Sequence, residues 1–184
     1  MTACVSCENS SEDCGSASAG TCNKGAGRIS GFLKNACISC EAGKYKSDSN
    51  NNACSLIPAG KWGRVTNDDT SQISKVGALE LIDCSNGYYS TIGSTSCQAV
   101  PPGNFGTADS GASSAQLGAT GYSPCLAGTY IADPTTITSG NKCTVTTGGG
   151  FYTAISDNDT TYVETGAAAI VPCPNGTYNN NDKN

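Results

Sequence analysis

Residues 40–62 read CEAGKYKSDSNNNACSLIPAGKW and contain two short phrases that recur along the chain. The first phrase is Cys-x2-Gly-x-Tyr, and the second is Cys-x5-Gly-x-aromatic. The first phrase occurs at Cys40/Gly43/Tyr45, Cys84/Gly87/Tyr89, Cys125/Gly128/Tyr130 and Cys173/Gly176/Tyr178. The second phrase occurs at Cys54/Gly60/Trp62, Cys97/Gly103/Phe105 and Cys143/Gly149/Phe151. Because the two phrases alternate in a fixed order, they predict a repeat protein.

A third landmark comes before each return of the first phrase. It is a Gly-Ala pair whose glycine stands seven residues before the next cysteine, at Gly77-Ala78, Gly118-Ala119 and Gly166-Ala167. Successive copies of the first phrase start 44, 41 and 48 residues apart. We therefore divide the chain into N-terminal cysteine-rich units (1–39), repeat 1 (40–83), repeat 2 (84–124), repeat 3 (125–172) and the start of a further repeat completed by the next copy (173–184).

The residue types of the two phrases indicate the local structure of each unit. A glycine just after the cysteine allows a tight turn, and the aromatic residue two positions later is the largest apolar group available to cover the sulfur atoms. Short β-prone runs bounded by Gly, Asn and Asp predict hairpins, and no stretch shows helical periodicity with caps. We expect a small disulfide-rich fold, mostly β and irregular: an elongated rod of stacked cysteine-rich repeats with short β-hairpins, in which each unit contacts only its neighbours.

The composition argues for cross-links and against several classes of partner. Only 37% of the 184 residues are hydrophobic and 14% are charged, so apolar burial alone would barely offset the loss of chain entropy. Twelve cysteines supply the alternative source of stability. The net charge is −5 with scattered basic residues, which argues against nucleic-acid binding. No run approaches the roughly 20 apolar residues of a bilayer span, so we expect no membrane insertion in this segment.

The pattern resembles the ephrin-receptor-like, or growth-factor-receptor-like, cysteine-rich repeats, whose unit looks like Cys-x2-Cys-x2-Gly-x-Tyr. It is also similar to the cysteine-rich surface antigens of ciliates and other protists. The resemblance covers roughly Cys22 to Tyr178, and only Cys37-x2-Cys40 and Cys4-x2-Cys7 keep the double-cysteine form. Together with the disulfide-type cysteines, it favours an extracellular location, either at the cell surface or secreted.

Elsewhere one cysteine of each doublet is missing, and the absences follow a rule. Three residues before each glycine of the second phrase stand Ile57, Val100 and Thr146. Three residues before the later cysteines of the first phrase stand Leu81, Tyr122 and Ile170. We interpret this as alternate units having lost both partners of one bridge. Short units, which run from a cysteine of the first phrase to the cysteine of the second phrase, are then stapled by a disulfide. Long units, which run from Ile57, Val100 or Thr146 to the position three residues before the next first-phrase cysteine, hold the same place with a small hydrophobic contact.

The repeat restricts the disulfide pairing, which the number of cysteines alone leaves open. Within units it predicts Cys7–Cys14, Cys22–Cys37, Cys40–Cys54, Cys84–Cys97 and Cys125–Cys143. Cys4 and Cys173 remain, and joining the two chain ends would separate them by 15 positions, against 14 for Cys40 and Cys54. We therefore expect a Cys4–Cys173 bridge between identical copies arranged head-to-tail, as a tandem array or a filament. The alternative is a truncated domain with two spare thiols.

Other chemistries of these residues fit the sequence less well. The doublets Cys4-x2-Cys7 and Cys37-x2-Cys40 have zinc-site spacing, but the remaining cysteines follow the disulfide-like repeat. The chain has no histidine, so the common catalytic triads are excluded. Acidic loops at Asp68-Asp69 and Asp157-Asn158-Asp159 are solvated turns, or at most weak calcium sites. We expect no catalytic residue, no resident metal and no cofactor, and hence no enzyme.

Three Asn-x-Ser/Thr sequons, at Asn9, Asn158 and Asn175, predict covalent N-linked glycans on a secreted chain. The function that these observations favour is structural: an extracellular, disulfide-stapled, glycosylated repeat segment that forms a surface rod or fibril by head-to-tail continuation. The alternative is a cell-surface antigen or receptor-type ectodomain that binds a partner. It would show an exposed apolar or aromatic patch beyond the repeat aromatics.

Overall fold

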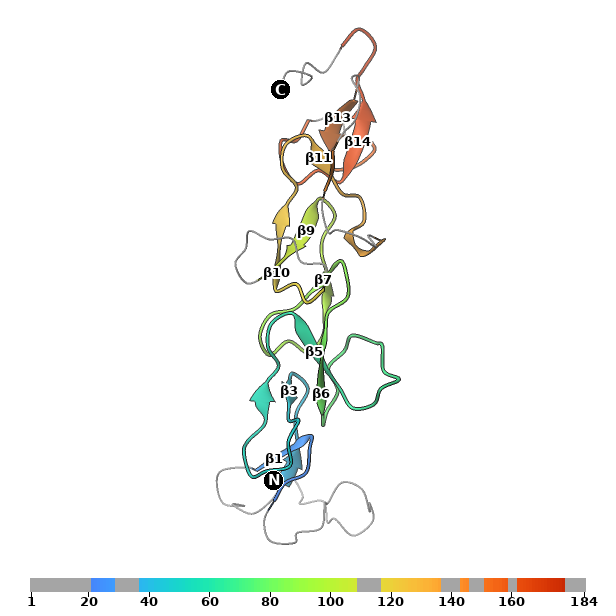
Figure 1. The fold of residues 1–184 in the computed structure, drawn as a ribbon. Coiled ribbons are helices and arrows are strands. Elements are labelled where there is room, and N and C mark those ends of the chain that lie inside the picture. Colours follow the sequence, from blue (N-terminus) through green and yellow to red (C-terminus); the bar gives the residue numbers. More distant parts are fainter. Residues whose placement is uncertain are drawn as a thin grey trace, which may run out of the picture. The chain divides into compact units, whose positions relative to one another are not determined.

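The structure, a computed structural model, describes residues 21–28, 37–108, 117–136, 143–145, 151–158 and 162–177. The chain forms two compact units. Unit 1 comprises Met1–Pro58, Trp62–Ile82 and Ile92–Ser96, and unit 2 comprises Ala59–Lys61, Asp83–Thr91 and Cys97–Asn184. In the described residues of both units, short strands are joined by longer irregular segments (Figure 1).

All the described strands are short and pair only two by two. They are β1 (Ala26–Arg28), β2 (Cys37–Ser39), β3 (Lys44–Tyr45), β4 (Ser55–Leu56), β5 (Lys61–Arg64), β6 (Glu80–Asp83), β7 (Tyr88–Tyr89), β8 (Gln98–Ala99), β9 (Asn104–Thr107), β10 (Gly121–Pro124), β11 (Thr129–Tyr130), β12 (Thr144–Val145), β13 (Phe151–Ala154) and β14 (Ala169–Pro172). Each pairs with its neighbour in sequence, β1 with β2 through β13 with β14. One 3-10 turn, η1 (Pro134–Thr136), is the only helical element of the described residues.

A glycine turn opens the hairpins, as the repeated phrase predicts. Gly43 has φ +83°, and the N–H of Lys44 donates to the carbonyl of Glu41 at 3.0 Å. A positive φ at the third residue of a four-residue turn is the signature of a type II turn, which requires glycine there. The same bond recurs from Tyr88 to Ser85 and from Thr129 to Leu126. The predicted disulfide-rich fold of short β-hairpins and irregular segments is confirmed.

Strand register corrects the alignment of the third copy of the second phrase. In the β9–β10 hairpin, Asn104 directly follows the turn glycine, Gly103. It faces Pro124, the residue directly before Cys125. In the β13–β14 hairpin, Phe151 faces Pro172 and so takes the place of Asn104. Tyr152, not Phe151, therefore matches Phe105. The spacing from Cys143 misled because register is set by strand pairing, and a loop absorbs an extra residue without moving the ladder.

The small core is built around the opening residue of each hairpin, which is a cysteine or the aliphatic residue that takes its place. Cys22, Cys40, Cys84 and Cys125 are almost fully buried. Ile57 and Val100 are buried equally well, at 0% and 2% exposure. An aliphatic side chain thus fills the place of an opening cysteine in the long units. On the closing side the match is looser, because Leu81 and Ile170 are half-buried and Tyr122 is 44% exposed.

The hairpin closed by Cys22–Cys37 belongs with the long units, although Cys22-x2-Gly25 imitates the first phrase, which opens the short ones. The N–H of Gly25 donates to the carbonyl of Lys46, in the next hairpin, at 2.9 Å. The same bond joins Gly60 to Ser90 and Gly103 to Ile131, and both of these glycines belong to long units. Short and long units both place a glycine three residues after the opening position, so this spacing cannot separate them. The hydrogen-bond partner of the glycine does.

The Cys22–Cys37 bridge therefore marks the place of the disulfide that the longer hairpins lack. We expect Ile57→Cys combined with Leu81→Cys to form a new disulfide, detected as a mass loss of two hydrogen atoms. The loop constraint is worth about 3.5 kcal/mol in the chain-entropy model. It is offset by about 1.5–3 kcal/mol of lost Ile57 burial. The net gain is about 1 kcal/mol.

The matched control for this variant is Ile57→Cys combined with Ile82→Cys. Side chains alternate across a strand, so a cysteine at position 82 of β6 points to the other face and should stay reduced. Equal oxidation of both double variants would contradict the equivalence with Cys22–Cys37.

Candidate functional site: a disulfide-stapled ladder

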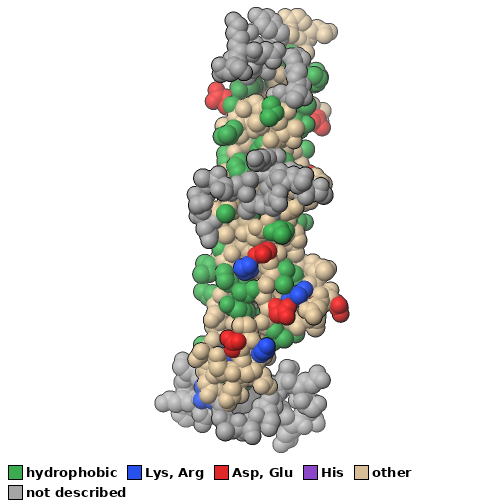
Figure 2. Space-filling view, viewed as in Figure 1, with side chains coloured by type: hydrophobic (Ala, Val, Ile, Leu, Met, Phe, Trp, Pro, Cys, Tyr) green, Lys and Arg blue, Asp and Glu red, His purple; other side chains and the backbone are tan. Residues whose placement is uncertain are grey.

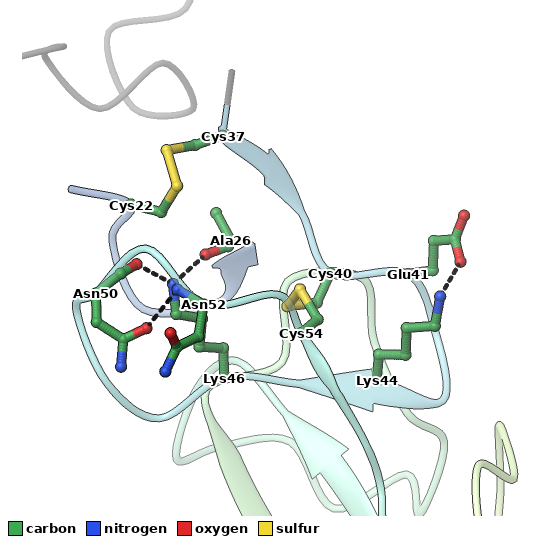
Figure 3. Close-up of a disulfide and its surroundings, with 10 residues drawn as sticks. All are labelled: Cys22, Ala26, Cys37, Cys40, Glu41, Lys44, Lys46, Asn50, Asn52 and Cys54. Carbon is green, nitrogen blue, oxygen red and sulfur yellow. Dashed lines mark hydrogen bonds and ion pairs between the residues drawn. A yellow bond between two sulfur atoms is a disulfide. The ribbon is translucent and has the colours of Figure 1, made fainter. Parts of the chain in front are cut away.

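Four disulfides close hairpins in the described residues. They are Cys22–Cys37, Cys40–Cys54, Cys84–Cys97 and Cys125–Cys143, the four pairs that the repeat predicted in this part of the chain. Their Cα–Cα distances of 5.4 to 5.7 Å are those of ordinary disulfides. Each opening cysteine is buried and each closing one is at least partly exposed. Figure 3 shows the first two bridges in unit 1.

The remaining predicted pairs are not reached by the described residues. Cys7–Cys14 and Cys4 lie outside them. Cys173 is partly exposed and has no disulfide partner within the described ranges. The Cys4–Cys173 link between copies therefore stays a prediction.

The buried cysteines also carry a backbone hydrogen-bond ladder. The N–H of Cys40 donates to the carbonyl of Gly25 at 2.7 Å, and the carbonyl of Cys40 accepts from the N–H of Gly77 at 2.7 Å. Cys84 and Cys125 repeat both bonds. Their four bonds, each 2.8 Å long, are Cys84 to Gly60, Gly118 to Cys84, Cys125 to Gly103 and Gly166 to Cys125. Each opening cysteine thus ties its own hairpin to one hairpin before it and one hairpin after it, within the same compact unit.

The Gly-Ala landmark has a physical role in this ladder. Its glycine donates to the cysteine carbonyl, and its alanine forms a parallel bridge with the tyrosine of the first phrase. These bridges join Ala78 to Tyr45, Ala119 to Tyr89 and Ala167 to Tyr130. All three alanines are buried, so no larger side chain fits there without displacing the neighbouring strand.

Lys46 is a structural residue that the sequence argument missed. Its side chain is 6% exposed, and its ammonium donates to the carbonyls of Ala26, at 2.9 Å, and Asn50 (Figure 3). Burial lowers the pKa of this amine below its ordinary value of 10.5. The two carbonyl bonds hold the loop after β3 onto the first hairpin. The sequence signal for this burial is the position directly after the tyrosine of the first phrase. Ser90 and Ile131 stand at the same position in later copies and are also buried.

The acidic residues of the described loops make local turn contacts. Bonds from Ser71 lower the pKa of Asp69, and bonds from Thr135 lower that of Asp133. An ion pair with Lys44, at 2.9 Å, lowers the pKa of Glu41. Among the residues that the structure describes, no group of three or more His, Cys, Asp or Glu is placed to hold a metal ion. Asp159, one of the proposed calcium ligands, lies outside them.

Small hollows lie on the described surface. One of about 280 Å³ in unit 1 is lined by the Cys40–Cys54 bridge, Gly27 and Ile38. On the face in Figure 2, side chains of opposite charge lie singly or beside one another and form no large patch of one sign. Arg64 and Glu80 form an ion pair, with Nε and Oε2 2.9 Å apart. In the described part of the chain, the contacts that recur from repeat to repeat are the backbone hydrogen bonds of the ladder, not the lining of a cleft.

The asparagines of two of the three sequons lie among the described residues. Asn158 and Asn175 are both exposed and both stand in turns. Asn9 lies outside the described residues.

Two further observations concern membranes and relatives. No helix in the described ranges has the length and apolar character that a bilayer span requires. Comparison of the sequence with protein-family models and with curated proteins gives no match.

Proposed function

We propose that this chain is an extracellular structural protein without catalytic activity. In this proposal it is a disulfide-stapled repeat segment, exposed at a cell surface or secreted, that carries N-linked glycans and extends a rod or fibril through head-to-tail continuation with identical copies. It binds no metal or cofactor. The resemblance to ephrin-receptor-like repeats and protist surface antigens is part of the proposal.

The observation that carries the proposal is the recurrence of one set of contacts. The bonds made by Cys40 in unit 1 are made again by Cys84 and Cys125 in unit 2, with lengths that agree within 0.1 Å. A surface selected to bind one partner concentrates distinctive residues at one place, whereas a ladder that repeats itself sets length and stiffness. The four disulfides of the described residues suit an oxidising compartment outside the cell.

The turn after Cys173 supports the head-to-tail part of the proposal. Gly176 has φ +86°, close to the +83° of Gly43, and the N–H of Thr177 donates to the carbonyl of Pro174 at 3.0 Å. Cys173 therefore begins a turn of the same kind as the stapled hairpins and, being partly exposed, is accessible to a closing cysteine. In the proposal Cys4 of a second copy supplies it.

Peptide mapping of non-reduced protein, secreted from eukaryotic cells, tests this function. We expect a Cys4–Cys173 peptide pair, covalent oligomers on a non-reducing gel, and sugar on Asn9, Asn158 and Asn175. Cys173→Ser should remove the oligomers and leave the four hairpin bridges intact. Each Asn→Gln change at a sequon should lower the mass by one glycan.

Two results would count against the proposal in separable ways. Free thiols at both Cys4 and Cys173, in a protein that stays monomeric, would reject head-to-tail continuation and favour the partner-binding ectodomain. Unmodified sequons in secreted protein would reject the glycan component alone.

A further inference from the structure

Tyr89 and Tyr122 form the one pair of aromatic rings in contact within the described residues. Tyr89 belongs to β7 and Tyr122 to β10, both in unit 2. Their ring centroids are 5.1 Å apart with an interplanar angle of 69°. We propose that this pair is an oxidative cross-linking site, at which a peroxidase-type oxidant joins the two phenols into dityrosine.

The place of Tyr122 in the repeat favours a covalent role. In the first hairpin the closing cysteine, Cys37, faces Arg28 in the strand pairing. Tyr122 faces Gly106, which stands at the same distance from its turn glycine as Arg28 does. Tyr122 thus occupies the closing-cysteine position of a hairpin whose opening position is Val100. A bond from this residue to β7 supplies a cross-link where the disulfide is absent.

Access and orientation also fit the reaction. Tyr122 is 44% exposed, so an oxidant can reach its side chain. Tyr89 is partly exposed, and its hydroxyl donates to the side-chain carbonyl of Gln98 at 3.1 Å. This bond fixes one ring. The edge-to-face contact brings a ring carbon of one tyrosine against the other ring.

The chemistry balances with hydrogen peroxide as the oxidant. Each phenol loses one electron and one proton to give a tyrosyl radical with spin density on the carbons ortho to the oxygen. The two radicals couple through one carbon–carbon bond between ortho carbons, and each ring regains its aromaticity when its ortho hydrogen moves to the oxygen. Two tyrosines and one hydrogen peroxide therefore give one dityrosine and two water molecules.

Proximity makes the coupling at this pair intramolecular. Two groups held in contact react as a unimolecular pair, whereas isolated surface tyrosines must first find a second molecule. Tyr162 is the matched comparison, because it is 45% exposed and has no ring contact among the described residues. The inference concerns unit 2 alone and stands whether or not copies join head-to-tail.

The test is mild oxidation of dilute purified protein with horseradish peroxidase and hydrogen peroxide. We expect a monomer lighter by two hydrogen atoms, the blue fluorescence of dityrosine, and one cross-linked peptide pair containing Tyr89 and Tyr122. Tyr122→Phe keeps the ring and its packing but removes the phenol, so the intramolecular product should fall to background. Tyr162→Phe should leave that product unchanged.

Two outcomes would overturn the inference. The first is an oxidised monomer without dityrosine, and the second is dityrosine found only in dimers and lost in Tyr162→Phe. Mapping of the Cys84–Cys97 bridge in every variant shows that unit 2 is folded, so a missing product is a chemical result and not a folding failure.

Discussion

Replacing Cys40 and Cys54 with alanine is expected to lower the free energy of unfolding of unit 1 by about 3 kcal/mol. The bridge closes a loop with a sequence separation of 14, and its loss frees that loop in the unfolded chain. Cys40 is also 1% exposed and holds two ladder bonds, to Gly25 and from Gly77. The single tryptophan, Trp62, is 3% exposed in unit 1, so its fluorescence during chemical denaturation reports the change.

The control variant imitates what the long units do. Cys40→Val with Cys54→Ala places an aliphatic side chain at the opening position, as Val100 does in its own hairpin, where it is 2% exposed. Its extra apolar burial should restore about 1.5 kcal/mol relative to the double alanine variant. If the valine variant is no more stable than the alanine one, an apolar contact does not replace a bridge in this fold.

Gly103→Ala is expected to destabilise unit 2 by about 2–5 kcal/mol. Gly103 has φ +75°, and an alanine there costs about 1–2 kcal/mol through its left-handed backbone alone. Its added Cβ would also lie 1.9 Å from the carbonyl oxygen of Gly166, in the following repeat. A backbone atom cannot swing aside as a side chain does, so about 1–3 kcal/mol of overpacking is added. Thermal denaturation measures the total loss.

Gly128→Ala separates the two causes. Gly128 has nearly the same backbone, with φ +71°, but no described atom lies within 4 Å of the Cβ position. It should lose only the cost of the left-handed conformation. Hydrogen exchange at the Gly166 amide, which donates to the carbonyl of Cys125, should accelerate in Gly103→Ala and not in Gly128→Ala. Equal losses in both variants would show that close packing of units contributes nothing at Gly103.

The sequence by itself determined the covalent framework and the class of fold. Cys-x2-Gly-x-Tyr places a type II turn directly after a cysteine, because glycine alone adopts the positive φ at no cost. Alternation of this phrase with the second one paired three bridges and predicted short hairpins, and the similarity of Cys22-x2-Gly25 to the first phrase paired Cys22 with Cys37. It also identified Ile57 and Val100 as occupants of cysteine positions. Each of these conclusions depends on local residue chemistry or on spacing along the chain.

Tertiary structure alone decided how the hairpins within each unit relate to one another. Whether Gly25 belongs to the long or the short series depends on its bond to Lys46, and the phrase around it fits both. The match of Tyr152 to Phe105 depends on strand register, which a loop of variable length hides from the sequence. The contact of Tyr89 with Tyr122 likewise joins residues from different hairpins of unit 2. Spacing fixes turns and bridges, but most partners in other hairpins are set by backbone hydrogen bonds, and of these only the bonds of the Gly-Ala landmark leave a mark in the sequence.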